Sequence, residues 1–193
     1  MISNKKLSKH NSFIVLNKTE EEEKMPINLE IKVRVKNFDL ILAGLKKVKA
    51  KKSGVLHQKD VYFSNAKGLL KLRKEGKNQQ LIRYQRDEKG KNRWSNFEIL
   101  ELHQAHAESF LRNLLTCEVV VEKERLLYLF GDTRIHLDKV KKLGNFIELE
   151  TRVLSTKKVA QQQFLFLLKA LQLNPKEELR LSYHDLLLQT GKK

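Results

Sequence analysis

Charged and apolar residues alternate in several short segments, and the charged positions could bind a phosphorylated anion. In residues 28–35, one Asn and three charged side chains alternate with Leu, Ile and Val. Because side chains in a β-strand alternate between its two faces, this segment has one apolar and one charged face. For one strand alone, the simplest interpretation is that the charged face lies in water.

The same pattern recurs around Lys71–Arg73, Arg134–Asp138 and Glu148–Glu150, and Lys123 and Arg125 also share one face. This repetition favours a closed barrel whose charged faces point inward and whose apolar outside is covered by helices. A small eight-stranded barrel can hold one compact ligand in its interior. The sequence therefore predicts a polar-lined barrel with a ligand site inside it.

The expected inner face carries more basic than acidic side chains. The candidate cations are Lys32, Arg34, Lys71, Arg73, Arg86, Lys123, Arg125 and Arg134. The candidate carboxylates are Glu30, Asp138, Glu148 and Glu150. Buried charges are costly unless they are matched, so a highly charged anion would stabilise this interior. Arg binds phosphate oxygens in pairs, and Lys supplies a compact point charge.

Glu148 and Glu150 are two residues apart, so on a strand they share one face. Such a pair could hold Mg²⁺ or Mn²⁺, which prefer oxygen ligands and commonly also contact substrate phosphates. From spacing alone, two solvent-exposed carboxylates on an edge strand are the alternative interpretation.

Eight strands interrupted by helices are predicted along the chain, which indicates an α+β protein with a mostly antiparallel sheet. Turn residues separate the strand segments, and Asn37 is a candidate helix cap. The strands are expected at residues 27–36, 55–64, 69–74, 80–87, 93–99, 117–130, 133–140 and 146–154. Helices are expected at residues 38–48, 102–115 and 156–173, and around Tyr183–Leu187.

The overall charge indicates an anionic partner. The chain has 193 residues, a formal net charge of +16 and 40% hydrophobic residues, which suits one domain with a core. Residues 1–25 have the composition of a flexible leader, and residues 26–193 retain 34 basic and 19 acidic residues. No segment has the length of apolar sequence that a membrane span needs. The single cysteine, Cys117, suits a reducing compartment, so a cytoplasmic location is expected.

Several segments resemble the CYTH superfamily, also called triphosphate tunnel metalloenzymes, over nearly the whole chain after Met25. Residues 28–32 resemble the family's opening E-x-E-x-K motif, with Asn28 in place of the first Glu. Residues 57–63 are similar to its second-strand signature, and residues 70–73 to its basic third strand. The remaining matches are residues 84–86, 123–150 and 182–187, and the last two are most similar to the class IV adenylyl cyclase-like branch.

The resemblance implies a closed eight-stranded antiparallel tunnel with helices outside it. It implies that the eight candidate cations bind a triphosphate, with Lys32, Arg86 and Arg125 acting on the reacting phosphate. It also implies that the four candidate carboxylates hold Mg²⁺ or Mn²⁺.

Three functions remain open from the sequence. Metal-dependent hydrolysis of inorganic, thiamine or nucleoside triphosphate is preferred, and cyclisation of ATP to cyclic AMP is the runner-up. The third is a non-catalytic protein that binds polyphosphate or nucleic acid, because a basic domain attracts phosphate backbones. A monomer or a homodimer, without a membrane partner, is expected.

Overall fold

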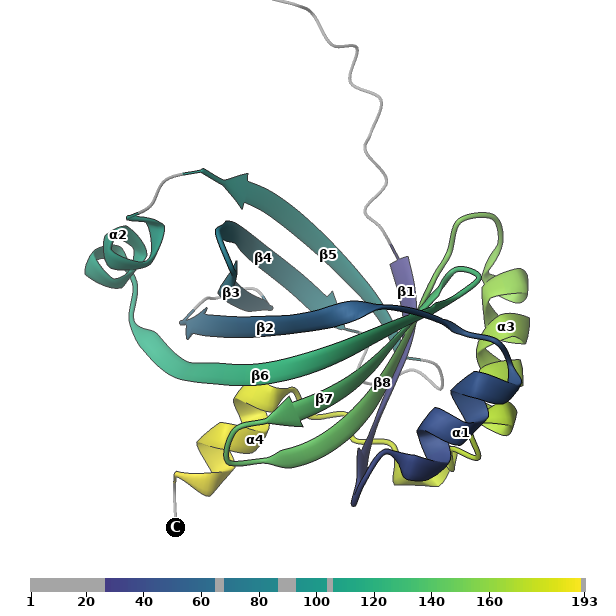
Figure 1. Ribbon diagram of the computed structural model, residues 1–193. Coiled ribbons are helices and arrows are strands. Elements are labelled where there is room, and N and C mark those ends of the chain that lie inside the picture. The colour runs from purple at the N-terminus through teal and green to yellow at the C-terminus, as the bar shows by residue number, and fades with distance from the viewer. Residues whose placement is uncertain (1–26, 65–67, 87–92, 104–105, 192–193) are drawn as a thin grey trace, which may run out of the picture.

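The computed structural model describes residues 27–64, 68–86, 93–103 and 106–191, apart from the side chains of residues 85, 86 and 93. The leader expected at residues 1–25 lies outside the described residues. The described residues form eight strands, four α-helices and one 3-10 turn (Figure 1).

The strands close into a barrel in which neighbouring strands are antiparallel. They are β1 (Ile27–Val35), β2 (Lys51–Phe63), β3 (Leu69–Glu75), β4 (Asn78–Arg86), β5 (Arg93–Leu102), β6 (Cys117–Phe130), β7 (Thr133–Val140) and β8 (Gly144–Arg152). Their order around the barrel is β1-β5-β4-β3-β2-β6-β7-β8. The predicted α+β fold with a closed eight-stranded antiparallel barrel is therefore confirmed.

The helices are α1 (Asp39–Lys47), α2 (Ala107–Leu114), α3 (Lys157–Ala170) and α4 (Tyr183–Thr190), and Pro175–Glu177 forms the 3-10 turn. Thr156 caps α3, because its side chain accepts a hydrogen bond from the Val159 N–H. Asn37 is not the cap of α1: the N-cap residue is Phe38, and the Asn37 side chain accepts a hydrogen bond from the Asp39 N–H one residue earlier in the turn. The helix expected at residues 102–115 is shorter than predicted, because β5 continues to Leu102.

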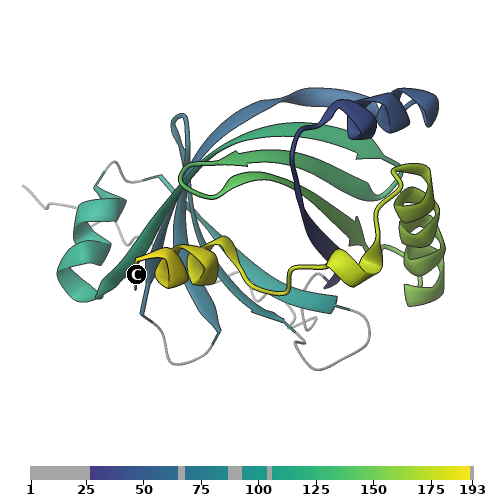
Figure 2. The same ribbon diagram turned by 90° about the horizontal axis from the view of Figure 1, so that it is seen from below.

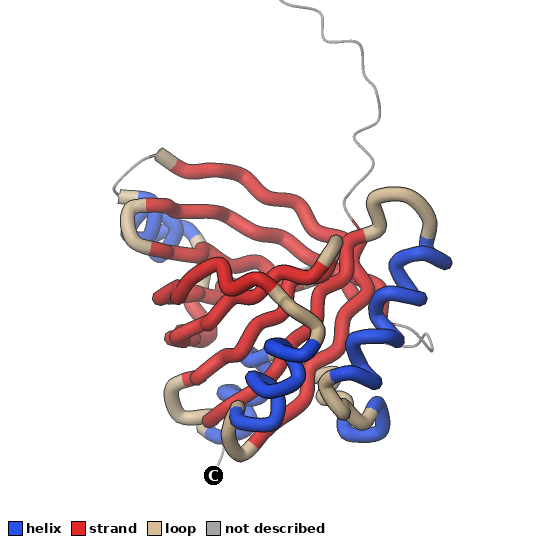
Figure 3. Tube along the Cα trace, turned by 45° about the vertical axis from the view of Figure 1, so that its right-hand side comes forward, coloured by secondary structure: helices blue, strands red, loops and turns tan. Residues whose placement is uncertain are grey.

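Helices α1 and α3 lie side by side against one wall of the barrel (Figures 1 and 3). Apolar side chains that face outward from β1, β7 and β8 pack beneath them, including Leu29, Leu137 and Leu149. On the other face of β1, Lys32 is also buried, with 2% of its surface exposed. Both faces of β1 are thus covered, which explains why its charged face does not lie in water.

Helix α4 runs across the barrel in the view from below (Figure 2). Its residues Tyr183 and Leu187 pack against inward-facing apolar side chains, among them Val121, Val140 and Phe146. The C-terminal helix therefore contributes to the barrel interior. Among the described residues, no helix is both long enough and apolar enough to cross a membrane.

Candidate functional site

A cavity of about 220 Å³ lies inside the barrel. In the described part of the chain, six cationic and four acidic side chains line it. They are Lys32, Lys71, Arg73, Lys123, Arg125 and Arg134, and Glu30, Asp60, Glu148 and Glu150. The charged strand faces point into the barrel, as the alternation predicts, and they leave an excess of positive charge there.

Three of these cations surround Asp60 of β2, and we call Lys71, Arg73 and Lys123 the cation cluster. The ammonium groups of Lys71 and Lys123 lie 3.0 Å and 2.9 Å from Asp60 Oδ2, and Arg73 Nε lies 2.8 Å from Oδ1. Burial alone would raise the pKa of Asp60, but the charges of Arg73, Lys123 and Lys71 hold it well below its usual range. Asp60 is thus an ionised anchor for cations from two other strands.

Burial disfavours the protonated, charged forms of Lys71 and Lys123. It lowers the pKa of Lys71 well below its usual value, helped by the nearby charge of Arg73, and it also lowers the pKa of Lys123. An anion bound beside this cluster would stabilise the protonated form of both lysines.

Glu148 of β8 lies farther around the barrel and forms ion pairs with two cations. Its Oε1 lies 3.1 Å from Lys32 Nζ, and its Oε2 lies 2.7 Å from Arg125 Nη2. Burial would raise the pKa of Glu148, but the charges of Lys32 and Arg125 hold it well below the usual range. Arg125 also donates two hydrogen bonds, of 2.7 Å and 2.6 Å, to the carboxylate of Asp138.

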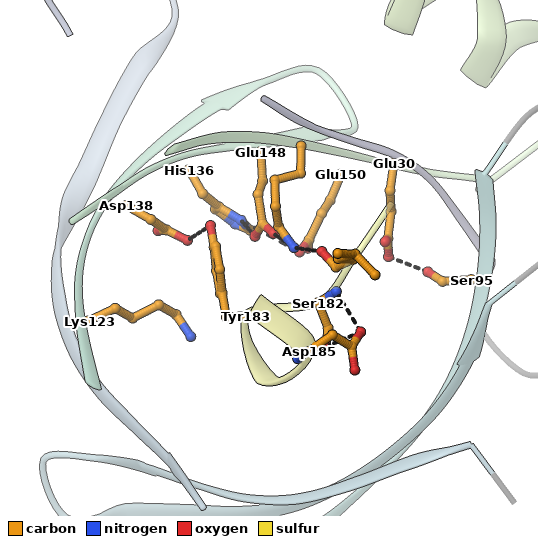
Figure 4. Close-up of polar contacts among 12 residues, drawn as sticks. Glu30, Ser95, Lys123, His136, Asp138, Glu148, Glu150, Ser182, Tyr183 and Asp185 are labelled. Carbon is orange, nitrogen blue, oxygen red and sulfur yellow. Dashed lines mark hydrogen bonds and ion pairs between the residues drawn. The ribbon is translucent and has the colours of Figure 1, made fainter. Parts of the chain in front are cut away.

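His136 of β7 lies beside Glu148 and Glu150 in this part of the barrel (Figure 4). One potential ligand atom from each of these three residues lies within 4.8 Å of the others, and we call them the His–Glu cluster. His136 is fully buried, and burial together with the charge of Arg125 lowers its pKa. Burial would raise the pKa of Glu150, but the charges of His136 and Arg134 lower it to about 2.

Glu30 and Asn28 come from β1, beside the His–Glu cluster. Glu30 is paired with Glu150 across β1 and β8, and it accepts a hydrogen bond from the Ser95 hydroxyl (Figure 4). Asn28 is 5% exposed and lines the cavity, and its side-chain oxygen makes no hydrogen bond within the described residues. Oxygen donors from β1 and β8 therefore face the same space.

The segment that begins α4 enters this site. The Tyr183 hydroxyl donates a hydrogen bond of 2.9 Å to Asp138 Oδ2 (Figure 4). Lys32 Nζ donates one of 3.1 Å to the Leu181 carbonyl oxygen. Lys32 Nζ also lies 4.2 Å from the centroid of the Tyr183 ring. The segment before α4 thus holds Lys32, one of the candidate cations, in place.

The structure does not bring all predicted site residues together. Arg34 is exposed and does not line the cavity, because its guanidinium packs over Phe146 and donates to the Leu143 carbonyl oxygen. Asp138 is fully buried behind Arg125 and lies outside the His–Glu cluster. Arg86 ends β4, and its side chain lies outside the described residues.

Sequence reasoning missed the contributions of Asp60, His136 and Tyr183. Period two places Asp60 on the inward face of its strand and His136 between Arg134 and Asp138, so both had a usable signal. Tyr183 lies in the matched segment 182–187, but no local pattern indicates its contact with Asp138, which is 45 positions away in the sequence.

The CYTH domain model matches residues 26–183 of this chain. No curated protein matches it. Among solved structures, PH1012 from Pyrococcus horikoshii OT3 is 24% identical with a TM-score of 0.73, covering 82% of this chain and 98% of its own. A candidate adenylate cyclase from Vibrio parahaemolyticus is 19% identical with a TM-score of 0.69, covering 86% and 99%. HpAC1 from Hippeastrum is 14% identical with a TM-score of 0.63, covering 86% and 96%. At these identities the likeness is one of fold.

Proposed function

The chain belongs to the CYTH domain family, and from this premise we propose that it is a metal-dependent enzyme that hydrolyses a triphosphate compound in its barrel. The substrate is inorganic triphosphate, thiamine triphosphate or a nucleoside triphosphate. The observation that carries this proposal is that one cavity is lined both by the cation cluster and by a group of carboxylates. The cation cluster surrounds Asp60, and the carboxylates Glu30, Glu148 and Glu150 come from β1 and β8.

The cation cluster and Arg134 bind the phosphate oxygens in this proposal. Arg73 offers a planar fork and Lys71 and Lys123 offer point charges, all in a buried site where electrostatic attraction is strong. Lys32 and Arg125 lie closer to the carboxylates and stabilise the charge that develops as the phosphate bond breaks. Arg34 and Arg86 remain predicted binders, although Arg34 lies outside the cavity lining.

The side-chain oxygens of β1 and β8 fit a divalent ion such as Mg²⁺ or Mn²⁺. Glu148, Glu150 and Glu30 offer carboxylate oxygens, and the buried side-chain oxygen of Asn28 has no hydrogen-bond partner among the described residues. A bound ion would neutralise charge on the phosphate oxygens. In this proposal Asp138 keeps Arg125 oriented and is a less direct metal candidate than its sequence position indicated.

One relative of the same fold supports hydrolysis over cyclisation. HpAC1 from Hippeastrum is described as a candidate adenylyl cyclase with a dominant triphosphatase activity. That statement concerns HpAC1, and it shows that a barrel of this shape is compatible with triphosphate hydrolysis.

Cyclisation of ATP is the second candidate, and one feature of the cavity favours it. Ile82 and Tyr84 of β4 pair with Ile99 and Phe97 of β5, and all four side chains line the cavity. This apolar strip could pack against a purine ring. Inorganic triphosphate would leave it without a partner.

The test is a product analysis with ATP, thiamine triphosphate and inorganic triphosphate, each with Mg²⁺ or Mn²⁺. We expect released phosphate to exceed cyclic AMP. We expect Glu148→Gln to reduce kcat by at least about a hundredfold, because the amide keeps the shape but loses the charge. Glu124→Gln is the control, since Glu124 is half-buried and pairs with Lys139 outside the cavity. Cyclic AMP as the main product, or an unaffected Glu148→Gln variant, would contradict the proposal.

A further inference from the structure

His136 is a fully buried imidazole on β7. Its exposed fraction is 0%, and neither ring nitrogen makes a hydrogen bond within the part of the chain that the structure describes. Buried polar groups nearly always have a partner, because an unpaired one costs about 1–3 kcal/mol. A group of this kind beside two cavity-lining carboxylates, Glu148 and Glu150, therefore needs an explanation.

The surroundings of His136 indicate what its partner is. Its Nδ1 lies 3.5 Å from Glu150 Oε1 and 3.8 Å from Glu148 Oε2. Two ligands that each lie about 2.1 Å from one ion are separated by about 3.0–3.5 Å at octahedral or tetrahedral angles. Small side-chain rotations would bring all three donor atoms to one ion. The three side chains come from adjacent strands, so their backbones are already fixed.

We propose that His136 is a direct metal ligand, and that with Glu148 and Glu150 it forms a site that prefers a first-row transition-metal ion over Mg²⁺. The proposal deepens the proposed function by naming the class of metal, and it uses the same cavity. Mg²⁺ is bound mostly through oxygen, whereas Mn²⁺, Fe²⁺, Co²⁺ and Zn²⁺ accept imidazole nitrogen together with carboxylates. A nitrogen ligand therefore favours these ions.

The cations around the His–Glu cluster would compete with a metal ion. Glu148 is already paired with Lys32 and Arg125, so an ion must compete with both cations for its oxygens. A triphosphate that attracts Lys32 and Arg125 would free Glu148 for the ion. The transition metal should therefore bind best when triphosphate is present.

The direct test uses the full chain, freed of metal by chelation and loaded with Mn²⁺ and inorganic triphosphate. Pulsed electron paramagnetic resonance should detect coupling between Mn²⁺ and an imidazole nitrogen. The coupling should disappear in His136→Gln and persist in His57→Gln, because His57 is exposed on β2 outside the cavity. Absence of nitrogen coupling in the unmodified protein would overturn the proposal, and this arm does not depend on whether any variant folds.

A binding titration provides the second readout. We expect His136→Gln to weaken Mn²⁺ and Co²⁺ binding about ten- to a hundredfold and to change Mg²⁺ binding much less. Equal effects on all three ions would contradict the inference. Hydrolysis with Mg²⁺ but without nitrogen coupling would leave the proposed function standing and refute the role of His136. Nitrogen coupling without turnover of any triphosphate would support the role of His136 and refute the proposed function.

Discussion

At the residue scale, Asp60 determines how the cation cluster is arranged before any substrate binds. One buried carboxylate meets two lysines and one arginine at 2.8–3.0 Å. Three cations held this close would repel one another without it, because charges interact strongly in a poorly solvated interior. Asp60 therefore positions groups that would otherwise need the substrate to bring them together.

Asp60→Asn should reduce the free energy of unfolding by about 3–5 kcal/mol, because it leaves buried cations without their counter-charge. Inorganic triphosphate should recover part of this loss, since it supplies negative charge to the same cluster. Urea unfolding with and without triphosphate measures both effects. Glu108→Gln is the matched control, because Glu108 also meets three cations but lies nearer the surface, where such pairs contribute little. Equal losses in the two variants, or no recovery with triphosphate, would contradict this account of Asp60.

At the scale of the element, α4 is fixed to the barrel by polar contacts at its first turn. Ser182 and Asp185 form a capping box, in which each side chain accepts from the backbone of the other residue. His184 lies between two carboxylates, 2.9 Å from Asp185 Oδ1 and 2.8 Å from Glu118 Oε2 on β6. These contacts hold Tyr183 where its hydroxyl can reach Asp138.

The contacts of His184 predict how stability depends on pH. Burial alone would lower its pKa, but the hydrogen bonds to Asp185 and Glu118 outweigh burial and raise it. Protonated His184 therefore contributes stability that is fully present below the unfolded-state pKa of about 6.5, and that is lost as pH rises through the higher folded-state pKa.

The difference in unfolding free energy between the unmodified protein and His184→Gln should be largest near pH 5.5 and should shrink towards about pH 9. Urea unfolding across this pH range measures the difference. The range lies above the pH at which carboxylates become protonated. The exposed His57→Gln is the control. A difference that is constant or grows with pH would show that the charge of His184 does not hold α4 in place.

At the scale of the whole molecule, the proposed function implies that the cavity couples anion binding to metal binding. Lys32 and Arg125 pair with Glu148 in this structure, so the proposed metal ligand is held by cations that a triphosphate would attract. Each ligand would remove a competitor of the other. The two affinities must then rise by the same factor, because coupling between binding sites is reciprocal.

Thermal unfolding should show this coupling as a shift larger than the sum of two separate shifts. A ligand that binds only the folded chain stabilises it by about 2.7 kcal/mol at a hundredfold excess over its Kd. Inorganic triphosphate with Mn²⁺ should raise Tm by more than the separate increases from triphosphate and from Mn²⁺. Sulfate at matched ionic strength should do much less, because the cavity is specific and not merely part of a chain with net charge +16. Additive shifts, or an equal effect of sulfate, would count against the coupled site.

The sequence by itself determined which faces of the strands are charged. Period two assigns Lys32, Lys71 and Glu148 to inward faces without knowledge of strand pairing, and all three line the cavity. The count of strands and their antiparallel closure also followed from local patterns and from the family resemblance. The face of a residue, however, does not give its height along the barrel.

The tertiary structure decided the height of each residue along the barrel, because register depends on closure between strands that are distant in sequence. Arg34 has the correct face, but it pairs with Phe146 across β1 and β8 and is exposed. β2 pairs with β6, which brings Lys123 within 2.9 Å of Asp60 across 63 positions. Likewise β7 lies beside β8, which sets His136 opposite Glu148. The local alternation determines which way each side chain points. Which charged side chains meet depends on pairing between strands that are distant in sequence, and no local pattern contains that information.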